Sequence, residues 1–233
     1  MKNLRTLTIF CQHGGERFGA LVGFELLKRG CAVEIGNPRA FLKGTRFFET
    51  DTRKTMFISE GESYDRHQFD RITRECDKYD LVIDIHTTTA NVGKVAILNE
   101  GDDELINVAL KLGYTNIAIM PKSIFQNTLS GNTKAKVISL EHGIDYRQDE
   151  ISAVELAERI RALNDTQMTI GTVEVYHIKG TIPLNFQEAG LQNYKFNGKI
   201  DGYPFIVGES SYKTHAGFFA DRKETVIIED SND

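Results

Sequence analysis

The sequence contains few cysteines, no long apolar run and no excess of basic residues. Its three cysteines, Cys11, Cys31 and Cys76, are widely spaced and form no CxxC pair, so neither a thiolate zinc site nor a disulfide framework is supported. No apolar run approaches the ~20 residues that a membrane helix requires, and we expect no membrane span. The first residues lack the length and the cleavage site of a signal peptide, and we therefore expect a cytoplasmic protein.

The charge balance bears on the type of partner. The chain carries 28 Lys and Arg against 33 Asp and Glu, a net charge of −5, which argues against nucleic acid as a partner. The segment 37–54 departs from this balance because cations predominate in it. On charge alone a solvated loop is the better interpretation, and a small anionic ligand is the alternative. The cations of this segment are Arg39, Lys43, Arg46, Arg53 and Lys54.

Apolar patterning predicts an alternation of strands and helices over the first two thirds of the chain. We expect strands at residues 5–11, 31–36, 80–86, 116–120 and 135–141. We expect helices at residues 18–30, 63–79, 102–113 and 151–165. This order is typical of an α/β fold with a mixed, mainly parallel sheet and helices on both faces.

The pattern changes at about residue 168. Short β-like runs separated by glycines follow, among them "TIGTVEVYHIKG", "YKFNGKI" and "YPFIVGE". We therefore predict a main α/β domain over residues 1–167 and a small β-rich C-terminal domain over residues 168–233.

Polar side chains at strand ends suggest a site. His13 follows the first strand, His86 ends the strand 80–86 and Glu141 ends the strand 135–141. Ligand sites collect at the carboxyl ends of parallel strands, so these residues belong to one edge of the sheet. His13 and Glu16 are separated by two glycines, and they suit a metal site or, alternatively, the surface of an ordinary tight turn.

Two histidines and one carboxylate are a donor set that suits zinc in a catalytic site. His13, Glu16 and His86 would leave a fourth position for water, whose pKa zinc lowers to ~7. A separate carboxylate is then needed to take the proton, and Glu141 is the candidate. An arginine could stabilise the oxyanion, and Arg46 is the candidate.

Four segments in this order resemble the aspartoacylase and succinylglutamate desuccinylase family, a branch of the zinc carboxypeptidase-like fold. They are "HGGE" at 13–16, "NPRAFLKGTRFFETD" at 37–51, "DIHTTTANVG" at 84–93 and "YPFIVGESSYKTHAGFF" at 203–219. The resemblance covers nearly the whole chain, and the aspartoacylase branch is the most similar.

The resemblance implies a role for individual residues. His13, Glu16 and His86 would bind one zinc ion per chain, Arg46 would polarise the scissile carbonyl, and Glu141 would act as general base and then as general acid. Asn37 and Tyr212 would contact the substrate. The implied activity is hydrolysis of the acyl-amide bond of a small anionic N-acyl amino acid, such as N-acetylaspartate.

One segment departs from the family's pattern. The family has Asp-Leu-Asn-Arg where this chain has "DTRK" at 51–54. Lys54 replaces the arginine that would grip the substrate's carboxylate, and Arg53 replaces the neighbouring asparagine. An ammonium cannot reproduce a bidentate grip, although the positive charge is retained. We expect both residues to bind substrate. His142, beside Glu141, is also a departure, because the family has Glu-Val-Gly there.

Several alternatives remain open at this point. A deacylase of the succinylglutamate desuccinylase type or a carboxypeptidase would use the same fold, and a non-catalytic module that binds a metal and an anion would use the same ligands. Asp84 could orient a zinc-bound histidine or act as a structural hydrogen-bonding residue. A homo-oligomer is also open.

Overall fold

The computed structural model describes residues 4–49, 63–99, 101–126, 128–165, 170–186 and 190–229. Arg53 and Lys54, both expected to bind substrate, lie outside these ranges. Within them, no helix has both the length and the apolar character that crossing a membrane requires.

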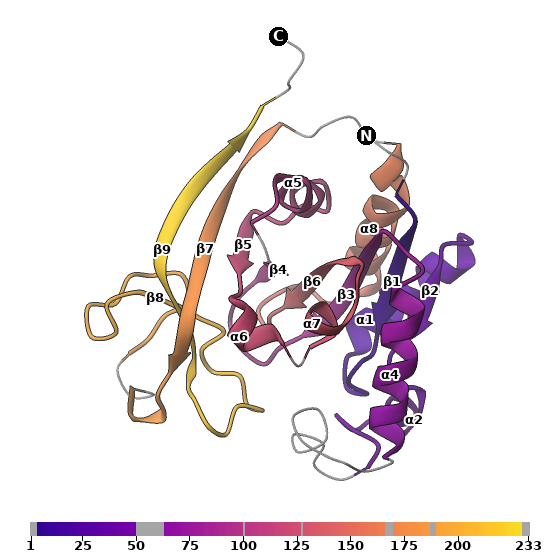
Figure 1. The fold of residues 1–233 in the computed structure, drawn as a ribbon, viewed down its shortest axis with the longest axis horizontal. Coiled ribbons are helices and arrows are strands. Elements are labelled where there is room, and N and C mark those ends of the chain that lie inside the picture. The colour runs from indigo at the N-terminus through magenta and orange to yellow at the C-terminus, as the bar shows by residue number, and fades with distance from the viewer. Residues whose placement is uncertain are drawn as a thin grey trace. The chain divides into compact units, whose positions relative to one another are not determined.

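The described strands and helices alternate over most of the chain (Figure 1). The strands are β1 (Thr6–Phe10), β2 (Val33–Ile35), β3 (Leu81–Thr87), β4 (Lys94–Leu98), β5 (Asn116–Ile119), β6 (Lys136–His142), β7 (Gly171–Ile182), β8 (Tyr203–Phe205) and β9 (Gly217–Ile228). The helices are α1 (Arg17–Lys28), α2 (Pro38–Lys43), α4 (Tyr64–Cys76), α5 (Asp103–Lys111), α6 (Lys122–Phe125), α7 (Leu129–Asn132) and α8 (Glu150–Arg161), with 3₁₀ turns at Ala162–Asn164 and Leu184–Phe186.

The strands form a mixed sheet. Their hydrogen-bonded order is β2-β1-β3-β6-β4-β5-β7-β9-β8. β1 pairs in parallel with β2 and β3, and β5 pairs in parallel with β4 and β7. β9 runs antiparallel to β7 and β8. The prediction of a mixed, mainly parallel sheet in an α/β fold is therefore confirmed.

The chain divides into two compact units. Unit 1 comprises residues 1–86, 125–139 and 148–165, and unit 2 comprises residues 87–124, 140–147 and 166–233. Each unit thus combines three separate stretches of sequence. The division into domains at residues 167 and 168 stays a prediction.

In unit 1, helices cover both faces of β1. Leu7 and Ile9 point to one face, where they pack with Ile72 and Cys76 of α4. Phe10 is on the opposite face because successive side chains alternate along a strand, and it packs with Ala20 of α1. The strand is buried at four of its five positions, as expected for a strand covered on both faces.

In unit 2, the long pair of β7 and β9 extends the parallel strands β4 and β5. The pairing of β7 with β9 runs from Gly171 opposite Ile228 to Ile182 opposite Gly217, with irregular register near Ile178. A β-like run was predicted at residues 194–200, but the chain there forms turns with one isolated bridge, between Asn197 and Gly202. Strands β4 and β9 and helix α2 were not predicted.

Candidate metal centre

The candidate metal ligands come together at the ends of two neighbouring strands. β1 and β3 are parallel and pair as far as Phe10 opposite Ile85. His13 and Glu16 lie in the turn that follows β1, and His86 lies near the end of β3. One ligand atom from each of the three residues lies within 4.8 Å of the others.

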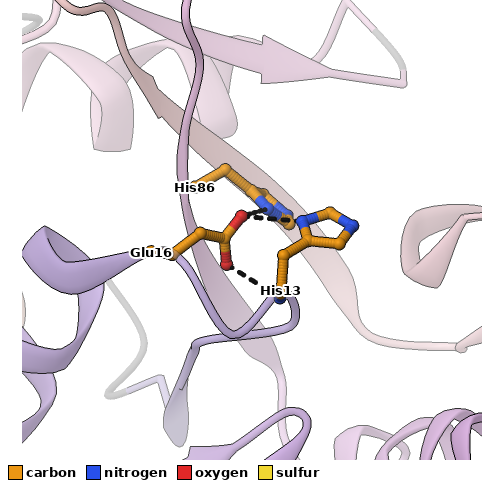
Figure 2. A group of neighbouring side chains, drawn as sticks. All are labelled: His13, Glu16 and His86. Atoms are coloured by element: carbon orange, nitrogen blue, oxygen red, sulfur yellow. Dashed lines mark hydrogen bonds and ion pairs between the residues drawn. The ribbon is translucent and has the colours of Figure 1, made fainter. Parts of the chain in front are cut away.

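Glu16 is at the centre of this group (Figure 2). Its Oε1 atom is 2.8 Å from His13 Nδ1 and 2.9 Å from His86 Nδ1. Its Oε2 atom accepts a hydrogen bond of 3.0 Å from the backbone N–H of His13. The Glu16 side chain is 4% exposed, so this carboxylate depends on the two imidazoles rather than on water.

A close backbone contact shapes the turn that carries His13 and Glu16. A Cβ atom at Gly14 would lie 2.0 Å from the carbonyl oxygen of Ala40 and 2.3 Å from that of Thr45, so only glycine fits. The N–H of Gly14 donates a hydrogen bond of 3.3 Å to the carbonyl of Arg46. The turn therefore packs directly on the segment that contains Arg46.

The protonation of the three residues follows from their mutual contacts. Burial acts to raise the pKa of Glu16, but the charges and hydrogen bonds of His13 and His86 outweigh it and hold that pKa well below its usual range. Burial lowers the pKa of His13. Burial also acts to lower the pKa of His86, but the carboxylates of Asp84 and Glu16 raise it well above its usual value.

These properties fit a divalent metal ion. Two imidazole nitrogens face one ionised, buried carboxylate, and positive charge is what stabilises that carboxylate. A metal ion can supply this charge in place of the imidazole protons, which is why metal binding releases protons at such sites. Two nitrogen ligands and one oxygen ligand match the three-residue sets of catalytic zinc sites.

The carboxylate of Asp84 contacts the ring nitrogen of His86 that does not contact Glu16. His86 Nε2 lies 2.8 Å from Asp84 Oδ2, and Gln12 Nε2 donates a hydrogen bond of 2.9 Å to the same oxygen. Asp84 is 3% exposed. A carboxylate on one ring nitrogen directs the lone pair of the other nitrogen toward the ligand position.

Arg46 lies beside this group in unit 1. Its positive charge acts with burial to lower the pKa of His13. Its guanidinium carbon is 5.6 Å from the ring centre of Phe47, and the Phe47 ring packs edge-on against the His13 ring at 5.3 Å. Arg46 is exposed. A cation near the candidate metal ligands but open to solvent is available to an incoming anionic group, and the role of Arg46 on the substrate carbonyl stays a prediction.

Asn37 has structural partners. Its Oδ1 atom accepts a hydrogen bond of 3.0 Å from the N–H of Ala40 and so caps α2. Its Nδ2 atom donates to Asp65 Oδ1. Asn37 is 5% exposed. The substrate contact expected of Asn37 stays a prediction, and the described contacts give this residue a capping role.

The predicted base and the predicted substrate tyrosine belong to unit 2. Glu141 lies within β6, one residue before the strand ends, and is half-buried. Tyr212 lies in the loop between β8 and β9, with its ring centre 4.3 Å from that of His215 and 5.5 Å from that of Phe218. Their roles in the chemistry stay predictions.

Three polar residues with well-defined contacts had not been singled out from the sequence. Gln12 contacts Asp84 as described above. Asp65 accepts backbone hydrogen bonds of 3.2 Å from Phe48 and 3.0 Å from Glu49. Glu209 binds residues more than a hundred positions away in the sequence. No local sequence signal marks these residues, because each acts through a partner that only the fold brings near.

Comparisons with known proteins found curated relatives named aspartoacylase. No protein-family model matches the chain. The chain is 27% identical to aspartoacylase of Rattus norvegicus over 135 residues, which cover 48% of this chain and 43% of the rat protein. It is 30% identical to aspartoacylase of Danio rerio over 131 residues, which cover 47% of this chain and 41% of that protein. The matched segments thus span less than half the length of these curated relatives.

Solved structures share the fold over nearly the whole chain. Murine aminoacylase 3 matches with a TM-score of 0.69 and 15% identity, covering 98% of each chain. The succinylglutamate desuccinylase of Chromobacterium violaceum matches with a TM-score of 0.69 and 14% identity, covering 96% of this chain and 84% of that chain. At such identities the likeness concerns the fold alone. Together, the curated sequence relatives and the shared fold support the aspartoacylase and succinylglutamate desuccinylase family as the family of this chain.

Proposed function

We propose that the protein is a zinc-dependent amidohydrolase that cleaves the acyl-amide bond of an N-acyl amino acid. The observation that carries the proposal is the convergence of His13 Nδ1 and His86 Nδ1 on Glu16 Oε1, at 2.8 and 2.9 Å. Such a set of three donors leaves a coordination position for the reaction. The relatives named aspartoacylase and succinylglutamate desuccinylase support the same class of reaction.

The ligand set is proposed to hold one zinc ion per chain. His13, Glu16 and His86 would hold it, with Asp84 orienting His86. When bound, zinc acidifies a water molecule and polarises a carbonyl group. The remaining steps belong to side chains of the protein.

Glu141 is proposed to transfer the proton. It takes a proton from the attacking water, whose oxygen forms a bond to the amide carbon. It then gives the proton to the amine nitrogen as the carbon–nitrogen bond breaks, so that a carboxylate and a free amino acid leave. Arg46 is proposed to stabilise the negative charge on the carbonyl oxygen between these steps.

The substrate is proposed to be anionic, with N-acetylaspartate as the first choice. Of the cations in segment 37–54, Arg39 already lies over the ring of Tyr64, with its guanidinium carbon 4.3 Å from the ring centre. Arg46 lies beside the metal ligands, as described above. The family's position for gripping a carboxylate corresponds to Lys54, with Arg53 beside it.

The cysteines fit a reducing compartment. Cys11, Cys31 and Cys76 are all free thiols, and burial raises the pKa of Cys11 and of Cys76 to about 12. Free thiols without disulfides are typical of proteins kept in a reducing compartment. We therefore propose a cytoplasmic location.

The test of function combines metal content with product analysis. Purified protein is analysed for zinc, and the zinc-loaded protein is assayed for free amine on a panel of N-acetyl, N-succinyl and peptide substrates. Release of acetate supports an aspartoacylase-like activity, succinate supports a desuccinylase, and a C-terminal residue supports a carboxypeptidase.

The matched variants are His86→Ala and His67→Ala, because His67 is an exposed histidine on α4. We expect about one zinc ion per chain in wild type and in His67→Ala, and loss of zinc and activity in His86→Ala. Equal zinc content in all three proteins would show that His86 is not a zinc ligand. A protein that binds zinc but hydrolyses no substrate of the panel would contradict the enzyme and favour an anion-binding module.

A further inference from the structure

Gln12 lies next to the metal ligand His13, yet its side chain is directed to a different residue. The Nε2 atom of Gln12 donates to Asp84 Oδ2 at 2.9 Å, across 72 positions of sequence. Asp84 Oδ2 in turn lies 2.8 Å from His86 Nε2. The contacts form a chain from Gln12 through Asp84 to His86, which ends at Glu16 Oε1.

The position of Gln12 is fixed by its neighbours. A Cβ atom at Gly36, just after β2, would lie 2.7 Å from Gln12 Cα and 2.8 Å from Gln12 Cγ. The absence of a side chain at residue 36 therefore leaves the space that Gln12 fills. Cys11, the preceding residue, has a φ of 54°, a left-handed conformation that is uncommon for a residue other than glycine. The backbone and the packing together place the Gln12 amide on Asp84.

The Asp84 carboxylate uses only one of its two oxygens in the hydrogen bonds described. It is 3% exposed, and its second oxygen, Oδ1, is buried without a hydrogen-bond partner in the described part of the chain. Both of the contacts described for this carboxylate therefore fall on Oδ2. Removal of the Gln12 amide would leave His86 as the remaining donor to this carboxylate, which would then be free to turn about its bond to Cβ.

We infer that Gln12 is a positioning residue of the metal centre, which fixes the Asp84 carboxylate and through it the ring of His86. The amide is neutral and donates a hydrogen bond, so it stabilises the carboxylate without adding a competing positive charge. Asp84 then accepts the Nε2–H of His86 and leaves the Nδ1 lone pair directed at the ligand position. The inference rests on the proposed metal centre and assigns a role to a residue outside the ligand set.

The test measures metal affinity rather than turnover. Zinc dissociation constants are obtained by competition with a chelator for wild type, Gln12→Met and Gln12→Asn. Methionine keeps the length of the side chain and removes the donor, whereas asparagine keeps the amide and is one methylene group too short. Gln192→Met, at an exposed glutamine, is the matched control. We expect both variants at residue 12 to bind zinc about tenfold more weakly, at the low end of the range for residues that support metal ligands.

A double-mutant cycle tests whether Gln12 acts through Asp84. Gln12→Met is combined with Asp84→Asn, and we expect the effect of Gln12→Met on zinc affinity to shrink in the Asp84→Asn background. The visible absorption bands of the cobalt-loaded protein should shift in Gln12→Met and stay unchanged in Gln192→Met, because the bands report ligand geometry. Zinc affinity within twofold of wild type in both variants at residue 12, or effects that simply add, would overturn the inference.

The outcome also separates this inference from the proposed function. A wild-type protein that binds zinc and shows the expected loss in Gln12→Met, but releases no amine from N-acyl amino acids, would support the positioning role and contradict the enzyme. A wild-type protein that binds no zinc would overturn both.

Discussion

The carboxylate of Glu209 accepts a hydrogen bond of 2.5 Å from the hydroxyl group of Thr88, although 121 positions separate the two residues in the sequence. The same Oε2 atom accepts the N–H of Thr89 at 2.8 Å, and Oε1 accepts the N–H of Ser211 at 2.9 Å. Glu209 therefore ties the loop that carries Tyr212 to the residues that follow β3.

Substitution of Glu209 tests whether these hydrogen bonds hold the loop of Tyr212 in place. Glu209→Gln removes the negative charge and one acceptor, at a cost of about 1.5 to 3 kcal/mol for a charge-assisted contact. If Tyr212 contacts the substrate, we expect KM to rise about tenfold or more, with a smaller change in kcat. Steady-state kinetics on the preferred substrate provide the measurement, and Glu155→Gln on the exposed face of α8 is the control. An unchanged KM would mean that the loop needs no such anchor.

Low pH should weaken the hydrogen bonds that the Glu209 carboxylate accepts. Burial acts to raise the pKa of Glu209, but hydrogen bonds from Thr88, Ser211 and Thr89 outweigh it and lower the pKa from 4.5 to about 2. The folded pKa is depressed, so the stabilisation is fully present above about pH 4.5 and is lost as the pH falls toward 2. Urea unfolding of wild type and Glu209→Gln from pH 7 to pH 2.5 provides the measurement. Above pH 5 we expect the free energy of unfolding of the wild type to exceed that of Glu209→Gln. This difference should shrink as the pH falls toward 2.5. A difference independent of pH would contradict the depressed pKa.

The turn between His13 and Glu16 offers a matched pair of glycines. A Cβ atom at Gly14 would lie 2.0 Å from the carbonyl oxygen of Ala40, whereas one at Gly15 would meet nothing within 4 Å. We expect Gly14→Ala to destabilise the fold by roughly 1 to 3 kcal/mol, the range for overpacking, and to weaken zinc binding. Gly15→Ala should leave both properties near wild type. Thermal unfolding measures stability, and chelator competition measures zinc affinity. Equal stability and equal zinc affinity of the two variants would show that the turn can shift to accommodate a side chain at residue 14.

The role of Glu141 is tested by an isosteric change. Glu141→Gln cannot take a proton, and we expect the variant to keep its zinc and to lose activity on the order of 10²-fold or more. Zinc content and kcat on the same preparation provide the measurement. A rate near that of the wild type would show that Glu141 has only a structural role and that another residue acts as the base.

The departure at residues 51–54 predicts where specificity arises. If Lys54 or Arg53 binds the side-chain carboxylate of the substrate, Lys54→Met or Arg53→Met should lower kcat/KM for N-acetylaspartate about tenfold to a hundredfold, the equivalent of ~1.5 to 3 kcal/mol. N-acetylmethionine should be affected less, and it serves as the internal control. If neither variant changes the preference between the two substrates, the acidic-substrate proposal fails.

Local patterns predicted much of the fold and pointed to the three residues of the candidate metal centre, which the fold brings together. The strand before His13 and the strand that contains His86 both carry apolar residues on their two faces and are mostly buried, and the apolar residues allowed both strands to be predicted from the sequence. Parallel pairing then brings the two ends together. The expected helix 18–30 corresponds to α1 (Arg17–Lys28), and the expected helix 63–79 to α4 (Tyr64–Cys76), so the errors are confined to helix ends.

Other elements were missed for identifiable physical reasons. The segment Pro38–Lys43 was interpreted as a charged loop, yet Asn37 caps it, Pro38 begins it and Gly44 ends it in a left-handed conformation, so it forms the short helix α2. β9 escaped prediction because five consecutive residues of the strand, from Asp221 to Thr225, are exposed polar residues. The contacts of Gln12 and Glu209 could not be predicted, because their partners lie 72 and 121 positions away.

The interleaving of the two compact units has a consequence for folding during synthesis. The last stretch of unit 1 ends at residue 165, whereas unit 2 also requires residues 166–233, which include β7 and β9. Chains fold as their segments leave the ribosome, and contacts between distant segments form late. All three candidate zinc ligands belong to unit 1, while Glu141 and Tyr212 belong to unit 2. A nascent chain can therefore assemble its candidate metal ligands before the unit that holds its proposed catalytic base has been fully synthesised.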